Sequence, residues 1–528
     1  MPPKQQSEAD SRERSNALEP APGKFLKVAY LIPRQLAQAV RQGFSKSKRT
    51  FDASLAAWFG FPPSPPVPTL IDLLSKTDSL IMSEVQNGCF GDVEMMLGEF
   101  RKIILENRVV YTGTEAENVA LDQLWVNLLR LGLFDELLIL IRGYNLPLRP
   151  EVRRFIDYCE YQYGVSGRQG EAYRARYPGL DIFTMGCIVW GNEYVDNFLR
   201  YNLRSMLSEG NLPALRLQGQ VVFSIVTDAA SERRMRQDPL FAKLSDVADV
   251  SFIIVPDEMI RTLITGHLVQ NFYILYGMLD HCSIYFAEGA ASHLFMIPVD
   301  SIVADGSLQN MANYRHEGYE CCGGGNIVAE TETFLPALDA RFGGDGPIRI
   351  STDELATLAA EHAHHYFRSQ IVAVENEDFG KHPREIFWPV DGGIEIHSVF
   401  IHPLFTSVSG LAKYSRKHFA NVDYGMIPRM FAGREPIKVL EPRKAYVNNF
   451  TAGSRLYETT GRAFAIEDFL RSHNYSYPVQ KSLFGQPQAL PCRLGGWTAY
   501  GNVAQDVRAV NACFGIAEDE EVKRQPSQ

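Results

Sequence analysis

Three apolar runs in the middle of the chain limit its fold more than any other feature. Each of them ends in an aspartate. The runs are VVFSIVTD, VSFIIVPD and HLFMIPVD, which end at Asp228, Asp257 and Asp300. Segments with helical periodicity separate them. Strands that are apolar on both faces and alternate with helices are typical of a parallel sheet covered by helices on both sides. The sequence therefore predicts an α/β fold with a mostly parallel sheet.

Changes in composition divide the chain around this region. Residues 1–68 combine a polar start, a basic segment and the proline-rich linker FPPSPPVP, and we expect a disordered arm there. Residues 69–170 carry leucines at helical spacing and predict an all-α domain, either a bundle or helical-hairpin repeats. The α/β domain is predicted over 181–450, and 451–528 is predicted to form a C-terminal extension with a polar tail.

Charge restricts the partners that this chain can have. The net charge is −10, so we expect no nucleic-acid partner. Residues 24–49 differ from the acidic chain as a whole, because they carry lysines and arginines and no acidic side chain. This segment predicts either a peripheral contact with an anionic membrane surface or a solvated basic arm.

Three features of the sequence bear on the cellular compartment: the N-terminus, the length of the apolar runs and the cysteine pattern. The polar N-terminus is unlike a signal peptide, and no apolar run approaches the length of a membrane span. Two of the cysteines are adjacent and the others are scattered, a pattern that fits reduced thiols better than a disulfide framework. We therefore expect a cytoplasmic protein, with a peripheral location at the inner membrane surface if the basic segment binds lipid.

The aspartates that end the apolar runs are the first candidates for a ligand site. Ligands of open parallel sheets bind outside the carboxyl ends of the strands. A carboxylate there can hold Mg²⁺ or Mn²⁺, or can accept hydrogen bonds from sugar hydroxyls. Each aspartate is equally suited to a turn or a helix cap. Asp305 precedes Gly-Ser-Leu, and we expect it to cap the following helix, whereas Asp300 would contact the ligand.

Four segments within residues 185–445 resemble glycosyltransferases of the GT-A type, and in particular a group of bacterial glycosyltransferase-like proteins. The segments are WGNEYVDNFLRYNLRSMLSEGNLPAL, VVFSIVTD, FMIPVDSIVADGSL and GGIEIHSVFIHPLF. The resemblance implies a GT-A-like domain that binds a nucleotide-sugar donor. In such enzymes the end of the first strand holds the nucleotide, a role that the resemblance gives to Thr227 and Asp228 here.

The resemblance also implies a divalent metal, Mn²⁺ or Mg²⁺. An Asp-x-Asp motif at the end of a later strand binds the metal and the donor diphosphate, but that place reads Asp300-Ser301-Ile302 here and lacks the second aspartate. A histidine near the end of the GT-A core often completes the metal site, and His402 or His397 could fill that place. The predicted metal ligands are therefore Asp300 and His402. Asp257 joins the donor-binding set through its position at a strand end.

The segment IFWPVDGG supplies candidates for the acceptor side. The indole face of Trp388 suits the C–H face of a sugar ring, and the carboxylate of Asp391 suits a base that deprotonates an acceptor hydroxyl. Asp423 is a second candidate for this catalytic base. The alternatives are a core tryptophan and a turn aspartate.

These features together predict a glycosyltransferase, of the hexosyltransferase class, that moves a sugar from a nucleotide donor to a hydroxyl of a glycan precursor or a protein. Two other functions stay open. The incomplete Asp-x-Asp motif would also fit a non-catalytic scaffold with a degenerate GT-A fold. A nucleotidyltransferase would use a similar sheet, but would be expected to carry a basic glycine-rich loop after the first strand, and TDAASERRMRQ has no glycine.

Overall fold

A computed structural model describes the part of the chain from which the fold can be read. The described residues are 113–130, 150–260, 272–413 apart from 374 and 382, 427, 430–431, 436–454, 459–473, 478–492 and 497–516. Contacts divide the chain into two compact units, 1–69 and 70–528, and all described residues belong to the second. The predicted arm over 1–68, its membrane-binding segment and Asp423 lie outside the described residues.

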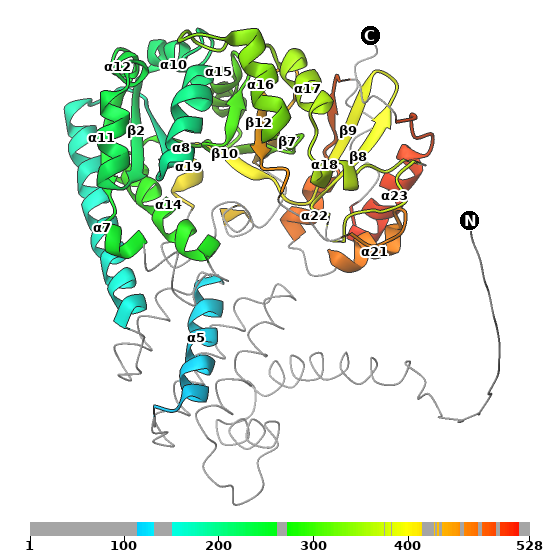
Figure 1. The fold of residues 1–528 in the computed structure, drawn as a ribbon, viewed down its shortest axis with the longest axis horizontal. Coiled ribbons are helices and arrows are strands. Elements are labelled where there is room, and N and C mark those ends of the chain that lie inside the picture. Colours follow the sequence, from blue (N-terminus) through cyan, green and yellow to red (C-terminus); the bar gives the residue numbers. More distant parts are fainter. Residues whose placement is uncertain are drawn as a thin grey trace, which may run out of the picture. The chain divides into compact units, whose positions relative to one another are not determined.

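A seven-stranded sheet forms the centre of the described unit (Figure 1). Its strands, in spatial order, are β11 (Ile437–Val439), β6 (Cys321–Gly324), β10 (His402–Thr406), β4 (His293–Met296), β1 (Ile182–Ile188), β2 (Gln220–Thr227) and β3 (Asp249–Ile254). All pairings are parallel except the two that β10 makes with β4 and β6. The prediction of an α/β fold with a mostly parallel sheet is confirmed.

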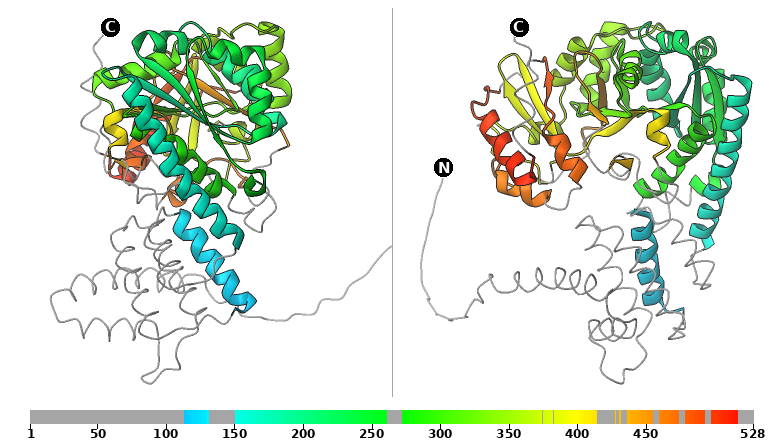
Figure 2. Two further views of the ribbon diagram at one scale, coloured as in Figure 1. Left: turned by 90° about the vertical axis from the view of Figure 1, so that its left-hand side faces the viewer. Right: turned by 180° about the vertical axis from the view of Figure 1, so that it is seen from behind.

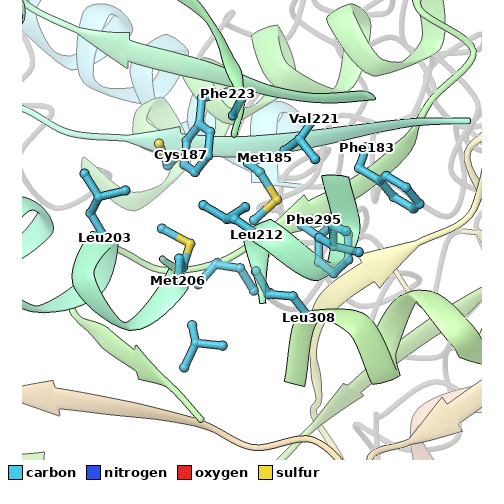
Figure 3. Close-up of a cluster of buried hydrophobic side chains, with 14 of the residues drawn as sticks. Phe183, Met185, Cys187, Leu203, Met206, Leu212, Val221, Phe223, Phe295 and Leu308 are labelled. Carbon is cyan, nitrogen blue, oxygen red and sulfur yellow. The ribbon is translucent and has the colours of Figure 1, made fainter. Parts of the chain in front are cut away.

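One face of the sheet packs on helices that follow β1, β2 and β5 (Ser301–Val303) in the chain. These helices are α8 (Asn192–Asn197), the π-helical turn η1 (Phe198–Asn202), α9 (Leu203–Met206), α10 (Leu212–Gln218), α11 (Ala229–Gln237), α12 (Pro239–Leu244) and α15 (Ser307–Asn313). Figure 3 shows Phe183, Met185 and Cys187, alternate residues of β1, among the apolar side chains of this layer. Alternation of this kind follows from the two-residue period of a strand. Each large apolar side chain buried here contributes about 1.5–3 kcal/mol.

The other face of the sheet is covered by α14 (Phe272–Gly289) and α7 (Pro150–Arg176) (Figure 2). The strand residues that face α14 are small. The hydroxyls of Thr184 and Ser292 lie 2.7 Å apart, and the Ser283 hydroxyl donates to the Ser224 carbonyl at 3.3 Å. A Cβ on Gly186 would lie 2.8 Å from Ser283 Cβ. The small side chains let α14 lie close against β1 and β2.

Helix α7 belongs to this layer rather than to a separate helical domain. The Tyr163 hydroxyl donates to the Met278 carbonyl at 2.7 Å, and Arg174 Nε donates to the Ala290 carbonyl at 2.7 Å. A Cβ on Gly170 would lie 2.1 Å from the Phe286 carbonyl oxygen. The backbones of α7 and α14 therefore meet directly. The predicted boundary at 170 cuts through a helix that packs on the α/β unit, and α5 (Glu115–Arg130) is the only other described helix from 69–170.

Two smaller sheets complete the fold. One contains β5, β12 (Val447–Thr451) and β7 (Ala329–Glu330), and the other contains β13 (Gln488–Leu490), β9 (Gly393–Ser398) and β8 (Glu385–Val390). The remaining helical elements are η3 (Tyr314–Glu317), α16 (Thr331–Phe342), α17 (Thr352–Glu361), α18 (His365–Ser369), α19 (Val408–Leu411), α21 (Ile466–Ser472), α22 (Pro478–Phe484) and α23 (Val503–Phe514).

The segment predicted as a C-terminal extension is part of the fold in its described residues. Strand β13 pairs with β9 of the predicted α/β domain, and β12 crosses the expected boundary at 450. Apolar residues of α21, α22 and α23 share a core with those of β8. No helix among the described residues is long and apolar enough to cross a membrane.

The contact between α7 and α14 gives a first prediction. Gly170→Ala places a methyl group against the Phe286 carbonyl, and we expect a loss of about 1–3 kcal/mol in the free energy of unfolding, even though alanine favours helix. Gly501→Ala is the control, because a Cβ there meets nothing within 4 Å. Urea unfolding measures both variants. Equal stability of Gly170→Ala and the wild type would contradict the packing of α7 on the α/β unit.

Candidate functional site

The order of the strands fixes where a ligand is expected to bind. The chain passes from β1 to β2 and β3 on one side, and then returns to β4 on the other side of β1. Open α/β sheets bind ligands at such a switch point, outside the carboxyl ends of the strands. Residues 189–191 follow β1 at this edge, and residues 297–300 follow β4. The candidate site is therefore the edge of the sheet at which these two loops lie.

Asn202 holds the loop that follows β4. Its side chain is 1% exposed, and its Nδ2 donates to the carbonyls of Pro298 at 3.0 Å and Ser301 at 2.9 Å. Asn202 ends the π-helical turn η1, and such turns are frequent at functional sites. Its Oδ1 is buried and has no hydrogen-bond partner among the described residues. Sequence reasoning missed Asn202, because a mid-helix asparagine carries no local signal of this role.

Asp300 and His402 come to the same edge of the sheet from distant parts of the chain. Asp300 is partly buried in the loop after β4, and its carbonyl accepts a hydrogen bond from Phe450 N at 2.9 Å. His402 is the first residue of β10, and the antiparallel course of that strand places its start beside the end of β4. His402 Nε2 lies 2.8 Å from the Met296 carbonyl oxygen. This contact requires the proton on Nε2, so the neutral ring keeps its lone pair on Nδ1.

The aspartates after β2 and β3 do not join this pair. Adjacent strands are about 4.8 Å apart, so the end of β3 lies about 14 Å from the end of β4. Asp257 is exposed at that outer position. Thr227 is fully buried, and its hydroxyl donates to the Val189 carbonyl. In the enzymes that the chain resembles, the end of the first strand holds the nucleotide. The first described strand of this sheet is β1, so the corresponding residues are 189–191 rather than Thr227 and Asp228.

Asp228 is the N-cap of α11. Its Oδ1 accepts from the backbone N–H groups of Ala230 and Ser231, both at 2.8 Å, and its Oδ2 accepts from the Ser231 hydroxyl at 2.7 Å. Partial burial raises the pKa of this carboxyl, but the hydrogen bonds from Ser231 and Ala230 outweigh it and hold the pKa below its usual value. The side chain is therefore occupied in starting a helix.

A small recess opens at this edge of the sheet. Its enclosed volume is about 20 Å³, and its wall includes Pro298, Asn326, His402, Tyr446, Asn449 and Gln488. That volume is enough for about one water molecule. The recess lies at the ends of β6 and β4 and at the start of β10, so it belongs to the carboxyl edge of the sheet. None of the three strand-end aspartates lines it.

The glycines of the segment CCGGGN allow other parts of the protein to pack closely against them. A Cβ on Gly323 would lie 2.0 Å from the His402 carbonyl oxygen, and one on Gly324 would lie 2.4 Å from Gln488 Nε2. A Cβ on Gly325 would lie 3.0 Å from Glu385 Oε1. The glycines thus let β10, β13 and β8 approach the end of β6, and the protein's own atoms fill the space that a phosphate would need.

The other predicted site residues lie elsewhere. Trp388 is fully buried in the core of the small sheet, so its indole offers no face to an acceptor in this structure. Asp391 is exposed in the turn between β8 and β9. His397 is buried on β9, with Nδ1 at 2.7 Å from the Phe484 carbonyl and Nε2 at 2.7 Å from Glu395. The structure brings none of the three to Asp300.

Asp305 has a different role from the one predicted. The N-cap of α15 is Gly306, with φ 86, and no side chain caps that helix. Asp305 instead accepts hydrogen bonds from Gly210 N at 2.8 Å and from Arg349 Nε at 3.0 Å. It ties the loop before α10 to the segment before α17. The left-handed backbone at Gly306 explains the error, because a glycine can supply that turn without a side-chain cap.

The described residues were predicted to include two metal ligands, Asp300 and His402. They contain no group of three or more His, Cys, Asp or Glu side chains that could bind one. Asp300 is followed by Ser301 and Ile302, whose side chains are buried.

Comparison with known protein families gives no match for this chain, and neither does comparison with curated proteins. Function is therefore inferred from the fold and from the side chains at the carboxyl edge of the sheet.

The cap at Asp228 gives a second prediction. Asp228→Ala should lower the free energy of unfolding by about 0.5–2 kcal/mol at pH 7. Folding lowers the pKa of this carboxyl from its ordinary value of 3.8. The charged carboxylate therefore adds to the free energy of unfolding above pH 3.8, and this contribution is lost as the pH falls through the lower pKa of the folded state. The gap between wild type and variant should therefore shrink from pH 7 to pH 3. Asp228→Asn, which keeps a capping oxygen, is the control. A gap that does not change with pH would contradict a charged cap.

Proposed function

We propose that this chain is a GT-A-like glycosyltransferase that binds a nucleotide-sugar donor at the edge of the sheet where β1 and β4 end. One observation supports the proposal more than any other. Asp300 and His402, the residues to which the resemblance gives the donor diphosphate and its metal, come to the same edge of the sheet at its switch point. Asp300 stands 102 positions before His402 in the sequence, and only the antiparallel course of β10 places them together.

The loop after β1 is the proposed place of the nucleotide. Gly191 has φ 79, a backbone conformation that glycine adopts without strain, and its N–H donates to the Ser231 hydroxyl at 3.1 Å. Ser231 in turn binds Asp228. Asp228 therefore serves the donor site indirectly, by fixing the loop after β1. Thr227, which was predicted to hold the nucleotide, is given a supporting role of the same kind, because its hydroxyl donates to the Val189 carbonyl.

Asp300 is the proposed contact with the donor itself. A carboxylate at this position can accept hydrogen bonds from sugar hydroxyls. Mg²⁺ is often bound through one or two carboxylates together with substrate phosphates, so a metal carried by the donor could share Asp300. No step of the proposal depends on that metal. The base that activates the acceptor hydroxyl stays open. Of the two candidates from the sequence, Asp391 lies in the turn between β8 and β9 and is not brought to Asp300, and Asp423 lies outside the described residues.

A thermal-shift panel of nucleoside diphosphates and nucleotide sugars, with and without Mn²⁺, tests the proposal. A donor at a hundredfold excess over Kd should add about 2.7 kcal/mol of stability. We expect Asp300→Asn to fold and to lose about tenfold in affinity for the donor, because a neutral amide accepts weaker hydrogen bonds from sugar hydroxyls than a carboxylate does. Asp257→Asn is the matched control, since Asp257 ends the outer strand β3, and its affinity should equal that of the wild type.

A non-catalytic scaffold is the second candidate. The missing second aspartate and the absence of a group of metal ligands among the described residues favour it. A chain that gives no shift with any nucleotide sugar, with or without Mn²⁺, would support the scaffold and would contradict the transferase. Equal loss of affinity in Asp300→Asn and Asp257→Asn would place the donor somewhere other than the ends of β1 and β4.

A further inference from the structure

We propose that the recess at the carboxyl edge binds one hydroxyl group of a sugar, and that the side-chain amides of Asn326 and Asn449 hold it. The inference rests on the proposed function in one respect, because the sugar would belong to the donor or to the acceptor of the transferase. Sequence reasoning singled out neither asparagine. They stand 123 positions apart in the sequence, and only the folded chain brings them together.

Both asparagines line the recess, from elements that lie against each other. Asn326 follows β6, and its Oδ1 accepts a hydrogen bond from Asn449 N, on β12, at 3.2 Å. Val447 and Asn449 are alternate residues of β12, so they share one face of that strand, and both line the recess. The two amides are therefore neighbours in one wall.

The hydrogen bonds around the recess leave these two amides available. The Tyr446 hydroxyl and both ends of the Gln488 amide are engaged within the protein, and His402 Nε2 donates to a main-chain carbonyl. In contrast, neither Asn326 Nδ2 nor the side chain of Asn449 has a hydrogen-bond partner among the described residues. Both asparagines are half-buried, so their amides are open to a ligand in the recess.

The two amides match the hydrogen bonds that a hydroxyl group makes. Asn326 Oδ1 is committed to Asn449 N, so the end of the Asn326 amide that remains for a ligand is Nδ2, which can only donate. The Asn449 amide offers its Oδ1 as an acceptor. A hydroxyl group accepts one hydrogen bond and donates another, so one hydroxyl can pair with both amides at once.

The composition of the wall favours a neutral ligand. No lysine, arginine, aspartate or glutamate is among the described residues that line the recess. A phosphate or an ammonium group would lose its hydration there without meeting an opposite charge, which is costly. The enclosed volume of about 20 Å³ suits a hydroxyl group, whose size is close to that of a water molecule.

Main-chain contacts tie this wall to Asp300. Phe450 N donates to the Asp300 carbonyl at 2.9 Å, and Asn449 pairs with Ser301 where β12 runs beside β5. Pro298, in the loop before Asp300, lines the recess itself. A sugar with one hydroxyl in the recess would therefore have its other hydroxyls close to the residue that is proposed to contact the donor.

Binding of free hexoses to the full chain tests the subsite. Glucose, galactose, mannose and N-acetylglucosamine serve as probes, and saturation-transfer NMR measures their Kd. The Asn449 amide makes no hydrogen bond among the described residues, so we expect Asn449→Ala to keep the wild-type melting temperature. Its affinity for the best hexose should fall about threefold to tenfold, the usual effect of one lost hydrogen bond. Asn326→Asp keeps the oxygen that Asn449 N needs and loses the donor, and should weaken binding by a similar factor.

Asn502→Ala controls for the loss of an asparagine as such. Asn502 is exposed at the start of α23, makes no side-chain cap and does not line the recess, so this variant should bind hexoses as the wild type does.

Monodeoxy analogues of the best hexose identify the bound hydroxyl. One analogue should bind the wild type about threefold to tenfold more weakly than the parent hexose does. The same analogue and the parent should bind Asn449→Ala equally well, because the variant has already lost the contact. This coupling would be absent if Asn449 only supported the shape of the wall.

Nucleotide sugars and nucleoside diphosphates distinguish the two sources of the hydroxyl. If Asn449→Ala weakens binding of the nucleotide sugar but not of the nucleoside diphosphate, the hydroxyl belongs to the donor. If it weakens only the binding of free hexoses, the hydroxyl belongs to the acceptor. Either result supports the subsite.

The same measurements separate this inference from the proposed function. Equal affinities of the wild type and Asn449→Ala for every hexose and every nucleotide sugar would overturn the subsite, and the transferase would stand if nucleotide sugars bind. If hexoses bind with the expected dependence on Asn449 and no nucleotide sugar binds, the subsite stands and the transferase fails. A wild-type protein that binds neither hexoses nor nucleotide sugars would overturn both.

Discussion

The parallel pairing of β4 with β1 is the constraint on which the rest of the structure depends. It runs from Phe183 opposite His293 to Gly186 opposite Met296. It forms only if α14 can cross closely over β1 and β2, and the small residues at Gly186, Ser283 and Ser292 allow that approach. Once β4 lies on the other side of β1 from β2, the sheet has a switch point, and the loops after β1 and β4 lie at the same edge. The position of the candidate site is therefore a consequence of helix packing on the far side of the sheet.

The side chains at this edge owe their positions to contacts from outside the sheet. Asn202 fixes the loop after β4 through two carbonyls, and Phe450 on β12 binds the carbonyl of Asp300. Strand β10 enters between β4 and β6, which places His402 against Met296. The same arrangement makes the recess, because the glycines after β6 admit Gln488 and Glu385. Pro298 lines the recess and belongs to the loop 297–300 of the proposed donor site, so a disturbance of this loop would reach both.

The sequence could predict the strands but not their partners. The three apolar runs are strands, and their aspartates do lie at one edge of the sheet. The spatial order of the strands is a long-range property, and the segment that forms β1 ends without the carboxylate that marked the other three runs as a site. Likewise His397 and His402 are five residues apart and lie in different sheets, which no local pattern distinguishes. Trp388 was open to either reading, and only the packed structure shows that its indole lies in the core.

Hydrogen–deuterium exchange in the presence of the nucleotide sugar that binds most tightly tests the location of the site most directly. A donor site at the switch point predicts slower exchange at 189–191 and 297–301, with little change at 255–257 after the outer strand β3. Protection that is confined to the end of β3, or to the opposite edge of the sheet, would contradict the account.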